Sequence, residues 1–322
     1  MKKLIITHGN CVDGCTCRGI LEEKYGDTAE YIEVDHSEID PAFPEKFQKF
    51  WDYVSQFKNT EVFMADICLK EVFINLFLEN NNILNIIDHH ETALPLIQKL
   101  RQKKQDNPNL PLNITFSDNN TESGAMLTWK HVHPNIQPPM HVEYVSDGDL
   151  WTFKYGYDTN YFYSGLLANN RQPKEVPKEY WIQLLHDDVE LKKVIELGSG
   201  IYGPYIEEVK SFLPFATEVV LDGHTGYMVN ASMKYKSELG NFLAQKNMTF
   251  GLVWEEKEDG MVACSLRSIK PFRVKEIAEK FGGGGHGQAA AFRLENIEKF
   301  EELLVKELQN KRPSFKNKLK NI

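Results

Sequence analysis

The stretch from Asn85 to Thr92, NIIDHHET, ends an apolar run with an aspartate and two adjacent histidines. Ionisable side chains are costly to bury unless they are paired or bind a ligand. Both imidazoles at a strand end need partners, and the single aspartate cannot serve both. The triplet Asp88-His89-His90 therefore indicates a binding or catalytic site.

Further histidines and aspartates follow other apolar runs and turns in the first half of the chain. Carboxylates packed together would repel one another, and a divalent cation removes that repulsion. Mixed imidazole and carboxylate ligands without a thiolate majority suit Mn²⁺, with Mg²⁺, Fe²⁺ or Co²⁺ as alternatives. So large a set suits a pair of ions about 3.5–4 Å apart, the arrangement that hydrolyses phosphate esters. Its members are His8, Asp13, Asp66, Asp88, His89, His90 and Asp147.

Each of these residues also has a simpler interpretation. Asp13-Gly14 and Asp147-Gly148 are ordinary turn dipeptides, and an aspartate after a strand is often a helix N-cap. Their joint occurrence at successive strand ends favours a shared site. Three cysteines near the N-terminus invite a zinc interpretation, but no Cys-x2-Cys pair exists and buried structural thiols are favoured.

The elements that must position this set are short β-rich runs that alternate with helix-like segments. Such alternation predicts a mostly parallel, doubly wound sheet covered on both faces. The ligand crevice of that sheet lies beyond the carboxyl ends of its strands, so the strands would deliver their histidines and aspartates to one edge. The expected strands are 4–6, 31–34, 62–65 and 83–87, with helical segments at 20–24, 71–78 and 94–100.

The second half predicts connecting helices and then a smaller α/β domain. The expected limits are 1–172 for the metal-binding domain, 173–214 for the helical connector and 215–322 for the second domain. Its expected strands are 218–221, 226–230, 249–253, 261–266 and 289–294, with helices at 237–245, 274–281 and from 297.

A run of four glycines and a histidine, residues 282–286, lies in the second domain. Composition alone fits a flexible linker, but the run continues into an apolar segment, which favours an ordered loop. Ordered glycines let backbone N–H groups approach an anion, and a nearby arginine and serine add a guanidinium and a hydroxyl. The expected substrate-binding residues are Arg267, Ser268, Gly283, Gly284, Gly285 and His286.

Composition limits the partners and the compartment. The chain of 322 residues has a net charge of −9, which excludes a general attraction to long nucleic acid. Five cysteines without a framework pattern favour a reducing cytoplasm. The N-terminal apolar stretch is too short for a signal peptide and no apolar run is long enough for a membrane span. We therefore expect a cytoplasmic protein with a small anionic substrate, and a homodimer is left open.

The ordered series of motifs resembles the DHH/DHHA1 phosphoesterase family over nearly the full length of the chain. The triplet alone is weakly specific, whereas the series with its glycine-rich ending is strongly specific. It comprises His8 with Asp13-Gly14, Asp66, DHHET, SDGDLW from Ser146, SELG from Ser237, SLRS from Ser265 and GGGGHGQAAAF from Gly282.

The resemblance implies a two-domain phosphodiesterase or phosphatase with two Mn²⁺ ions in a cleft between the domains. It implies that Asp88 orients a histidine and that His90 faces the phosphate. Many members carry Asp-x-Asp after the first histidine where this chain has Cys11-Val12-Asp13, so Cys11 is a further candidate ligand. The implied metal ligands are His8, Asp13, Asp66 as the bridge, His89 and Asp147, and the implied substrate contacts are Arg267, Ser268, the glycines and His286.

We therefore expect a hydrolase that uses metal-activated water to cut short oligonucleotides or linear dinucleotides into nucleoside monophosphates. An exopolyphosphatase or small-nucleotide phosphatase is the alternative within the same chemistry. A nucleotide-binding protein without activity is disfavoured, because an acidic cluster suits metals better than bare phosphate. Long DNA is disfavoured as well, since many phosphate contacts need a basic track.

Overall fold

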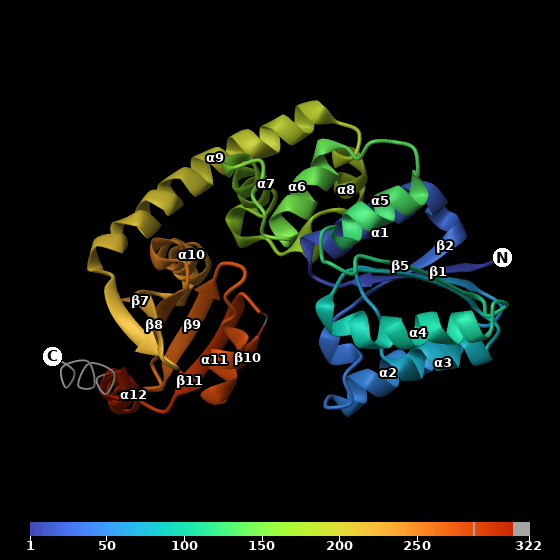
Figure 1. The fold of residues 1–322 in the computed structure, drawn as a ribbon. Helices are drawn as coiled ribbons and strands as arrows, with labels where there is room; N and C mark the ends of the chain where they lie inside the picture. Colours follow the sequence, from blue (N-terminus) through green and yellow to red (C-terminus); the bar gives the residue numbers. More distant parts are fainter. Residues whose placement is uncertain (286, 312–322) are drawn as a thin grey trace. The chain divides into compact units, whose positions relative to one another are not determined.

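The computed structural model describes residues 1–285 and 287–311 (Figure 1). The chain divides into two compact units, one of residues 1–202 and one that begins at Gly203. A five-stranded sheet forms the centre of the first unit and a six-stranded sheet that of the second. This confirms the predicted α/β class, with a parallel N-terminal sheet, connecting helices and a smaller α/β unit. Within the described ranges, no helix combines the length and apolar composition needed to cross a membrane.

The sheet of the first unit is parallel throughout, in the order β2-β1-β3-β4-β5. Register is set at the centre, where Ile5 lies between Tyr31 and Phe63 of the neighbouring strands. The four predicted strands are present, and the fifth was not predicted. The strands are β1 (Lys3–His8), β2 (Ala29–Val34), β3 (Glu61–Ala65), β4 (Ile83–Asp88) and β5 (Leu112–Phe116).

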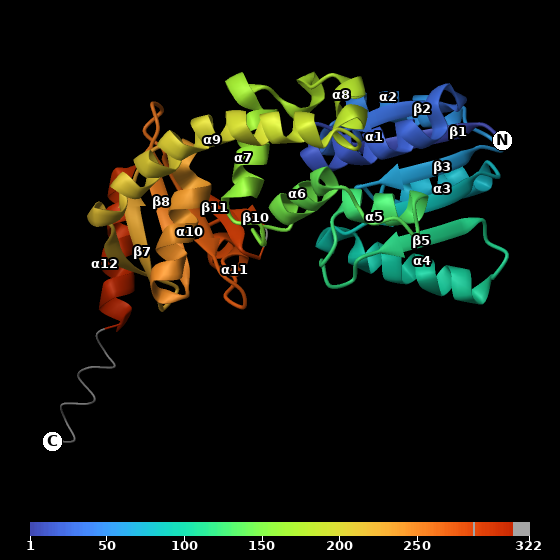
Figure 2. The same ribbon diagram turned by 90° about the horizontal axis from the view of Figure 1, so that it is seen from above.

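Helices cover both faces of this sheet (Figures 1 and 2). Because side chains alternate along a strand, Ile5 joins the core on one face while Leu4 and Ile6 join the core on the other. Burial on both faces explains why the strands are nearly continuous apolar runs. One face packs against α1 (Val12–Tyr25) and α5 (Gly124–Val132), and the other against α2 (Pro44–Ser55), α3 (Glu71–Glu79) and α4 (Leu94–Asp106).

Further helices complete the first unit and lead into the second. Two of them pack at glycines: a Cβ on Gly165 of α7 would lie 1.9 Å from the Val194 carbonyl oxygen of α9. The predicted connector contains helices, and the boundary between the units lies within α9. These helices are α6 (Met140–Asp149), α7 (Tyr157–Leu166), α8 (Lys178–Leu184) and α9 (Asp188–Ser211), with 3₁₀ turns η1 (Gly26–Thr28), η2 (His36–Glu38), η3 (Glu91–Ala93), η4 (Ala168–Asn170), η5 (Pro173–Glu175) and η6 (Leu213–Phe215).

The second unit has a mixed sheet in the order β10-β11-β9-β8-β7-β6, in which only β7 and β8 run parallel among the described strands. Its core includes Phe250, Leu266 and Phe292, each almost fully buried. The elements are β6 (Thr217–Leu221), β7 (His224–Asn230), η7 (Met233–Tyr235), α10 (Lys236–Asn247), β8 (Phe250–Glu256), β9 (Val262–Ser268), α11 (Lys275–Lys280), β10 (Gly284–Gly285), β11 (Ala289–Leu294) and α12 (Ile297–Lys311).

Candidate metal centre

Three strands of the first unit end in ionisable side chains at the carboxyl edge of the sheet. His8 is the last residue of β1, Asp66 follows β3, and Asp88 ends β4 directly before His89 and His90. Because all strands are parallel, their carboxyl ends meet at one edge. From β1 the chain adds β2 on one side and then returns to add β3 on the other, so the strand order reverses between β1 and β3. In doubly wound sheets, ligands bind at this point.

Two groups of potential ligand atoms lie at this edge, and the atoms of each group are within 4.8 Å of one another. In the first group, His8 Nδ1 lies 3.5 Å from an Asp66 oxygen and His90 Nδ1 lies 3.9 Å from the other. In the second group, His89 Nε2 lies 3.4 Å from Asp149 and 3.7 Å from Asp13. The first group is His8, Asp66 and His90, and the second is Asp13, His89 and Asp149.

Asp66 links the two groups. Its Oδ1 lies 3.2 Å from His89 Nε2 of the second group, while its Oδ2 faces His8 of the first. The residue is 1% exposed and has a left-handed backbone, with φ of +60°. Non-glycine residues adopt that conformation rarely, and such strain is concentrated at functional sites. The two carboxylate oxygens of Asp66 face different histidines, Oδ2 towards His8 and Oδ1 towards His89.

The N-terminus of α5 holds Asp13 in place. Its carboxylate accepts hydrogen bonds from the Ser123 hydroxyl at 2.8 Å and from the backbone N–H groups of Gly124 at 2.7 Å and Ala125 at 2.9 Å. Position 124 must be glycine, because a Cβ there would lie 2.6 Å from the Asp66 Cβ and 2.9 Å from an Asp13 oxygen. The helix end thus fixes one carboxylate while approaching a second.

Hydrogen bonds also fix both imidazoles of the triplet. Asp88 Oδ1 accepts from His90 Nδ1 at 2.7 Å and from the backbone N–H of His89 at 2.8 Å. The Asn120 amide oxygen lies 2.8 Å from His89 Nδ1. With a proton on Nδ1 for that bond, Nε2 of His89, which faces Asp66 and Asp13, is the nitrogen left to bind a metal after losing its own proton.

The site concentrates buried carboxylates, and this shifts the pKa values of its members. Burial, and then the charges of Asp66 and Asp149, raise the pKa of Asp13. Burial also raises the pKa of Asp149. Burial opposes the charged form of His89, but its hydrogen bond to Asp66 and the charge of Asp13 raise its pKa to about 10. Bound protons thus offset the buried carboxylates, and a divalent cation fits the same need with ligand types suited to Mn²⁺.

Asp147 is not brought into either group. Its buried carboxylate accepts hydrogen bonds from the hydroxyls of Thr152 and Thr159 and from the backbone N–H groups of Lys154 and Tyr155. Burial acts to raise its pKa, but these four donors outweigh burial and lower it. Asp149, which the sequence analysis did not single out, lies in the second group instead.

Cys11 also lies outside both groups. It occupies the N-cap position of α1, two residues before Asp13. Burial, with the charges of Asp66 and Asp13, raises the pKa of its thiol, so the protein alone keeps the sulfur protonated.

After Asp149, Asn120 is a second residue that sequence reasoning missed, because a single asparagine far from the triplet in sequence carries no pattern.

The predicted substrate residues of the second unit lie on β9 and at β10, the two strands that flank β11. Arg267 on β9 is paired with Ala289 of β11, and Gly285 of β10 is paired with Ala290. The Arg267 guanidinium donates to the Ser265 and Ser237 hydroxyls at 3.0 and 3.2 Å. The Ser268 hydroxyl donates to the Phe272 carbonyl at 2.8 Å. Gly283 and Gly284 lie at the same strand end, and His286 lies outside the described residues.

Fold and site together define an α/β protein with a parallel sheet, a candidate divalent-metal centre at the point where strand order reverses, and a second mixed-sheet unit. Residues 224–311 match the DHHA1 domain. The chain is 27% identical over 318 residues to an uncharacterised protein of Acanthamoeba polyphaga mimivirus, covering 91% of this chain and 68% of that one. It is 23% identical over 316 residues to the oligoribonuclease NrnB of Bacillus subtilis, covering 92% and 74%.

Among solved structures, the fold is similar to the pGpG-specific phosphodiesterase PggH of Vibrio cholerae. The TM-score is 0.55 at 15% identity, with 97% of this chain and 100% of that chain covered. The DHHA1 match lies in the second unit and includes the glycine-rich ending of the motif series.

Proposed function

We propose that this protein is a metal-dependent phosphodiesterase that hydrolyses short oligonucleotides or linear dinucleotides to nucleoside monophosphates. The observation that carries the proposal is the pair of adjacent ligand groups joined through Asp66 at the carboxyl edge of the sheet. The names of the relatives support it, since NrnB is an oligoribonuclease and PggH a phosphodiesterase specific for pGpG. The net charge of −9 favours a short substrate over a long one.

We assign the two groups to two ions, with Mn²⁺ as the proposed metal. His8 and Asp66 would hold one ion, and Asp13, His89 and Asp149 the other, with Asp66 between them. Divalent cations at such a site lower the pKa of water and offset the charge of a phosphate. Asp147 is replaced by Asp149 in this assignment because its oxygens already accept four hydrogen bonds.

His90 is proposed to contact the phosphate. Its side chain is 30% exposed, whereas that of His89 is 6% exposed. Burial opposes the charged form of His90, but the hydrogen bond to Asp88 raises its pKa. With Nδ1–H donated to Asp88, Nε2 is the ring nitrogen left to face a phosphate oxygen. Asp88 therefore acts by orienting His90 and by raising its pKa.

In the second unit we propose Arg267 as a phosphate contact. Its guanidinium is fixed by two serine hydroxyls, which leaves further N–H donors in a planar fork suited to phosphate. Gly240 permits this position, because a Cβ there would lie 2.8 Å from the Arg267 Cγ. The glycines of β10 would add backbone N–H donors, and Ser268, whose hydroxyl donates to Phe272, would support them.

The test combines a substrate panel with matched variants. Full-length protein is incubated with Mn²⁺ and one of four substrates: dinucleotides, a pentanucleotide, a linearised cyclic dinucleotide or polyphosphate. The nucleoside monophosphates released and the length of the polyphosphate are then measured. We expect release from the nucleotides, loss of turnover in Asp66→Asn and His89→Asn, and fewer bound Mn²⁺ ions in both variants. Shortening of polyphosphate alone would contradict the nucleotide assignment, and nucleotide binding that survives in both variants without turnover in the wild type would indicate a sensor.

A further inference from the structure

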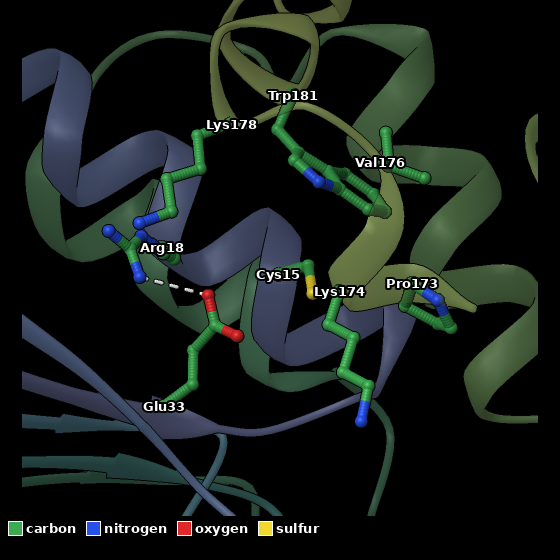
Figure 3. A pocket seen from close by; sticks show the side chains of 8 residues that line it. All are labelled: Cys15, Arg18, Glu33, Pro173, Lys174, Val176, Lys178 and Trp181. Atoms are coloured by element: carbon green, nitrogen blue, oxygen red, sulfur yellow. Dashed lines mark hydrogen bonds and ion pairs between the residues drawn. The ribbon is translucent and has the colours of Figure 1, made fainter. Parts of the chain in front are cut away.

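A cavity of about 230 Å³ lies in the first unit and shares no residue with the two ligand groups (Figure 3). Two parts of the chain contribute to it, α1 and β2 near the N-terminus and η5 and α8 between residues 173 and 184. At roughly 30 Å³ per water molecule, it has room for about eight waters, and its volume is below that of a drug-sized ligand site. It is lined by Cys15, Arg18, Glu33, Pro173, Lys174, Val176, Lys178 and Trp181.

The walls of the cavity are fixed by packing. Cys15, Val176 and Trp181 are each 3% exposed. Gly19 of α1 permits the close approach of α8, since a Cβ at that position would lie 3.0 Å from the Trp181 Cβ. The Arg18 guanidinium is held by Glu33 at 2.9 Å and by Glu22 at 3.2 Å. The cavity is therefore preorganised and does not depend on a loop closing over it.

The lining carries net positive charge in a protein that is strongly negative overall. Three cations and one carboxylate line the cavity. Lys174 and Lys178 are exposed, and neither forms an ion pair with any residue that the structure describes. Other lysines of this unit, such as Lys99 and Lys154, pair with glutamates. Arg18 and Lys178 lie on one side of the cavity in Figure 3 and Lys174 on the other, so an anion between them would meet donors from both sides.

Trp181 adds a neutral donor and an apolar wall. Its indole nitrogen points towards the middle of the cavity in Figure 3, and its N–H makes no hydrogen bond within residues 1–285 and 287–311. Pro173 and Val176 provide further apolar surface. Cys15 supplies no nucleophile, because burial, with the charge of Glu33, raises the pKa of its thiol to about 12. The arrangement therefore fits binding without chemistry.

We propose that this cavity binds a small organic phosphate, with Lys174, Lys178 and the Trp181 indole N–H as donors and Pro173 and Val176 against its carbon atoms. A phosphate dianion can accept from two ammonium groups and an indole at once, whereas a carboxylate offers a single charge. The volume admits a phosphate with a short carbon chain and excludes a dinucleotide. The site is thus separate from the one proposed for the phosphodiesterase reaction.

The test is calorimetric titration of the full-length protein in EDTA with glycerol 3-phosphate, inorganic phosphate and acetate as probes. The double variant Lys174→Gln/Lys178→Gln removes the two cavity lysines. The matched control Lys24→Gln/Lys192→Gln removes two exposed lysines that lie elsewhere in the same unit. Both doubles change the net charge equally, so a difference between them isolates the cavity from general electrostatics.

We expect one saturable site for glycerol 3-phosphate, with weaker inorganic phosphate and no acetate binding. The cavity double should weaken binding at least about tenfold and the control by less than about twofold. Trp181→Phe keeps an aromatic ring but removes the indole N–H. With an unchanged melting temperature, this variant should bind glycerol 3-phosphate more weakly than the wild type does. The proposal is overturned if no probe saturates, if the two doubles behave alike, or if Arg267→Gln alone abolishes the signal. None of these binding measurements depends on phosphodiesterase activity, so this proposal and the proposed function can fail independently.

Discussion

Replacing Asp147 by asparagine should destabilise the first unit and leave the metal ligands in place. The Asp147 carboxylate anchors the segment after α6 through four donors from residues 152–159. That segment contains Trp151 and Phe153 with left-handed backbones, at φ of +56° and +48°. Bulky residues in this conformation cost roughly 1–3 kcal/mol each and persist only where their surroundings enforce it. The Asp147 carboxylate supports this conformation by accepting hydrogen bonds from Thr152, Lys154 and Tyr155.

The magnitude follows from the hydrogen bonds. An asparagine keeps one oxygen for two of the four donors, loses the charge, and turns an amide NH₂ towards the other two. Hydrogen bonds to charged groups contribute about 1.5–3 kcal/mol each, so the loss of two in a site that is 1% exposed costs about 4 kcal/mol. In a unit of this size, about 1 kcal/mol lowers the melting temperature by about 2–4 °C, which gives a decrease of roughly 8–16 °C.

Asp149→Asn is the matched control, because it makes the same chemical change two residues later. Asp149 lies in an acidic group and its side chain is 24% exposed. Removing its charge relieves repulsion with Asp13 and Asp66, so stability in EDTA should be unchanged or higher. Its affinity for Mn²⁺ should decrease at least about tenfold, as expected for a lost ligand.

The assay is calorimetric unfolding in EDTA, in which the transition of each unit is followed, together with Mn²⁺ titration of both variants. For Asp147→Asn we expect a lower melting temperature in EDTA and unchanged Mn²⁺ affinity. For Asp149→Asn we expect a normal melting temperature in EDTA and weak Mn²⁺ binding. The reverse pattern would refute the reasoning, since it would make Asp147 the ligand and Asp149 a structural residue.

Three other predictions concern pH, sterics and support of a ligand. Burial lowers the pKa of His141 to about 3, so between pH 6.5 and 5 a proton binds this imidazole in the unfolded chain but not in the folded one. The free energy of unfolding should therefore decrease by about 2 kcal/mol over that range. Urea unfolding of His141→Gln should lack this pH-dependent decrease. Gly124→Ala should impair Mn²⁺ binding by displacing Asp66, whereas Gly200→Ala, where a Cβ meets nothing within 4 Å, should not; equal binding by both would contradict the steric argument. Asn120→Ala should weaken Mn²⁺ binding roughly 10–100-fold by releasing His89, and an unchanged titration would show that the Asn120 hydrogen bond is dispensable.

The strands that carry the site were predictable because they are buried on both faces of a parallel sheet. Burial on both faces leaves nearly continuous apolar runs such as 62–65 and 83–87, the second interrupted only by Asn85, and each run stops where polar side chains begin at the edge. β5 (Leu112–Phe116) was missed because four of its five residues are only partly buried or exposed, so its pattern is weak. α1 was placed too late, since Asp13 and Gly14 disfavour a helix and tertiary packing overrides that preference.

The choice between Asp147 and Asp149 shows why the rest of the site was not predictable. Both aspartates end the same helix, and spacing alone gives them equal claims to a metal. The difference comes from Thr159, on the next helix, and from the turn at Trp151, which together direct donors at one carboxylate and none at the other. Likewise, the Asp13 carboxylate depends on donors more than 100 residues away, at the start of α5. Residue types at strand ends therefore suffice to propose a chemistry for the edge, whereas the proposed assignment of each ligand depends on donors that only the folded chain brings together.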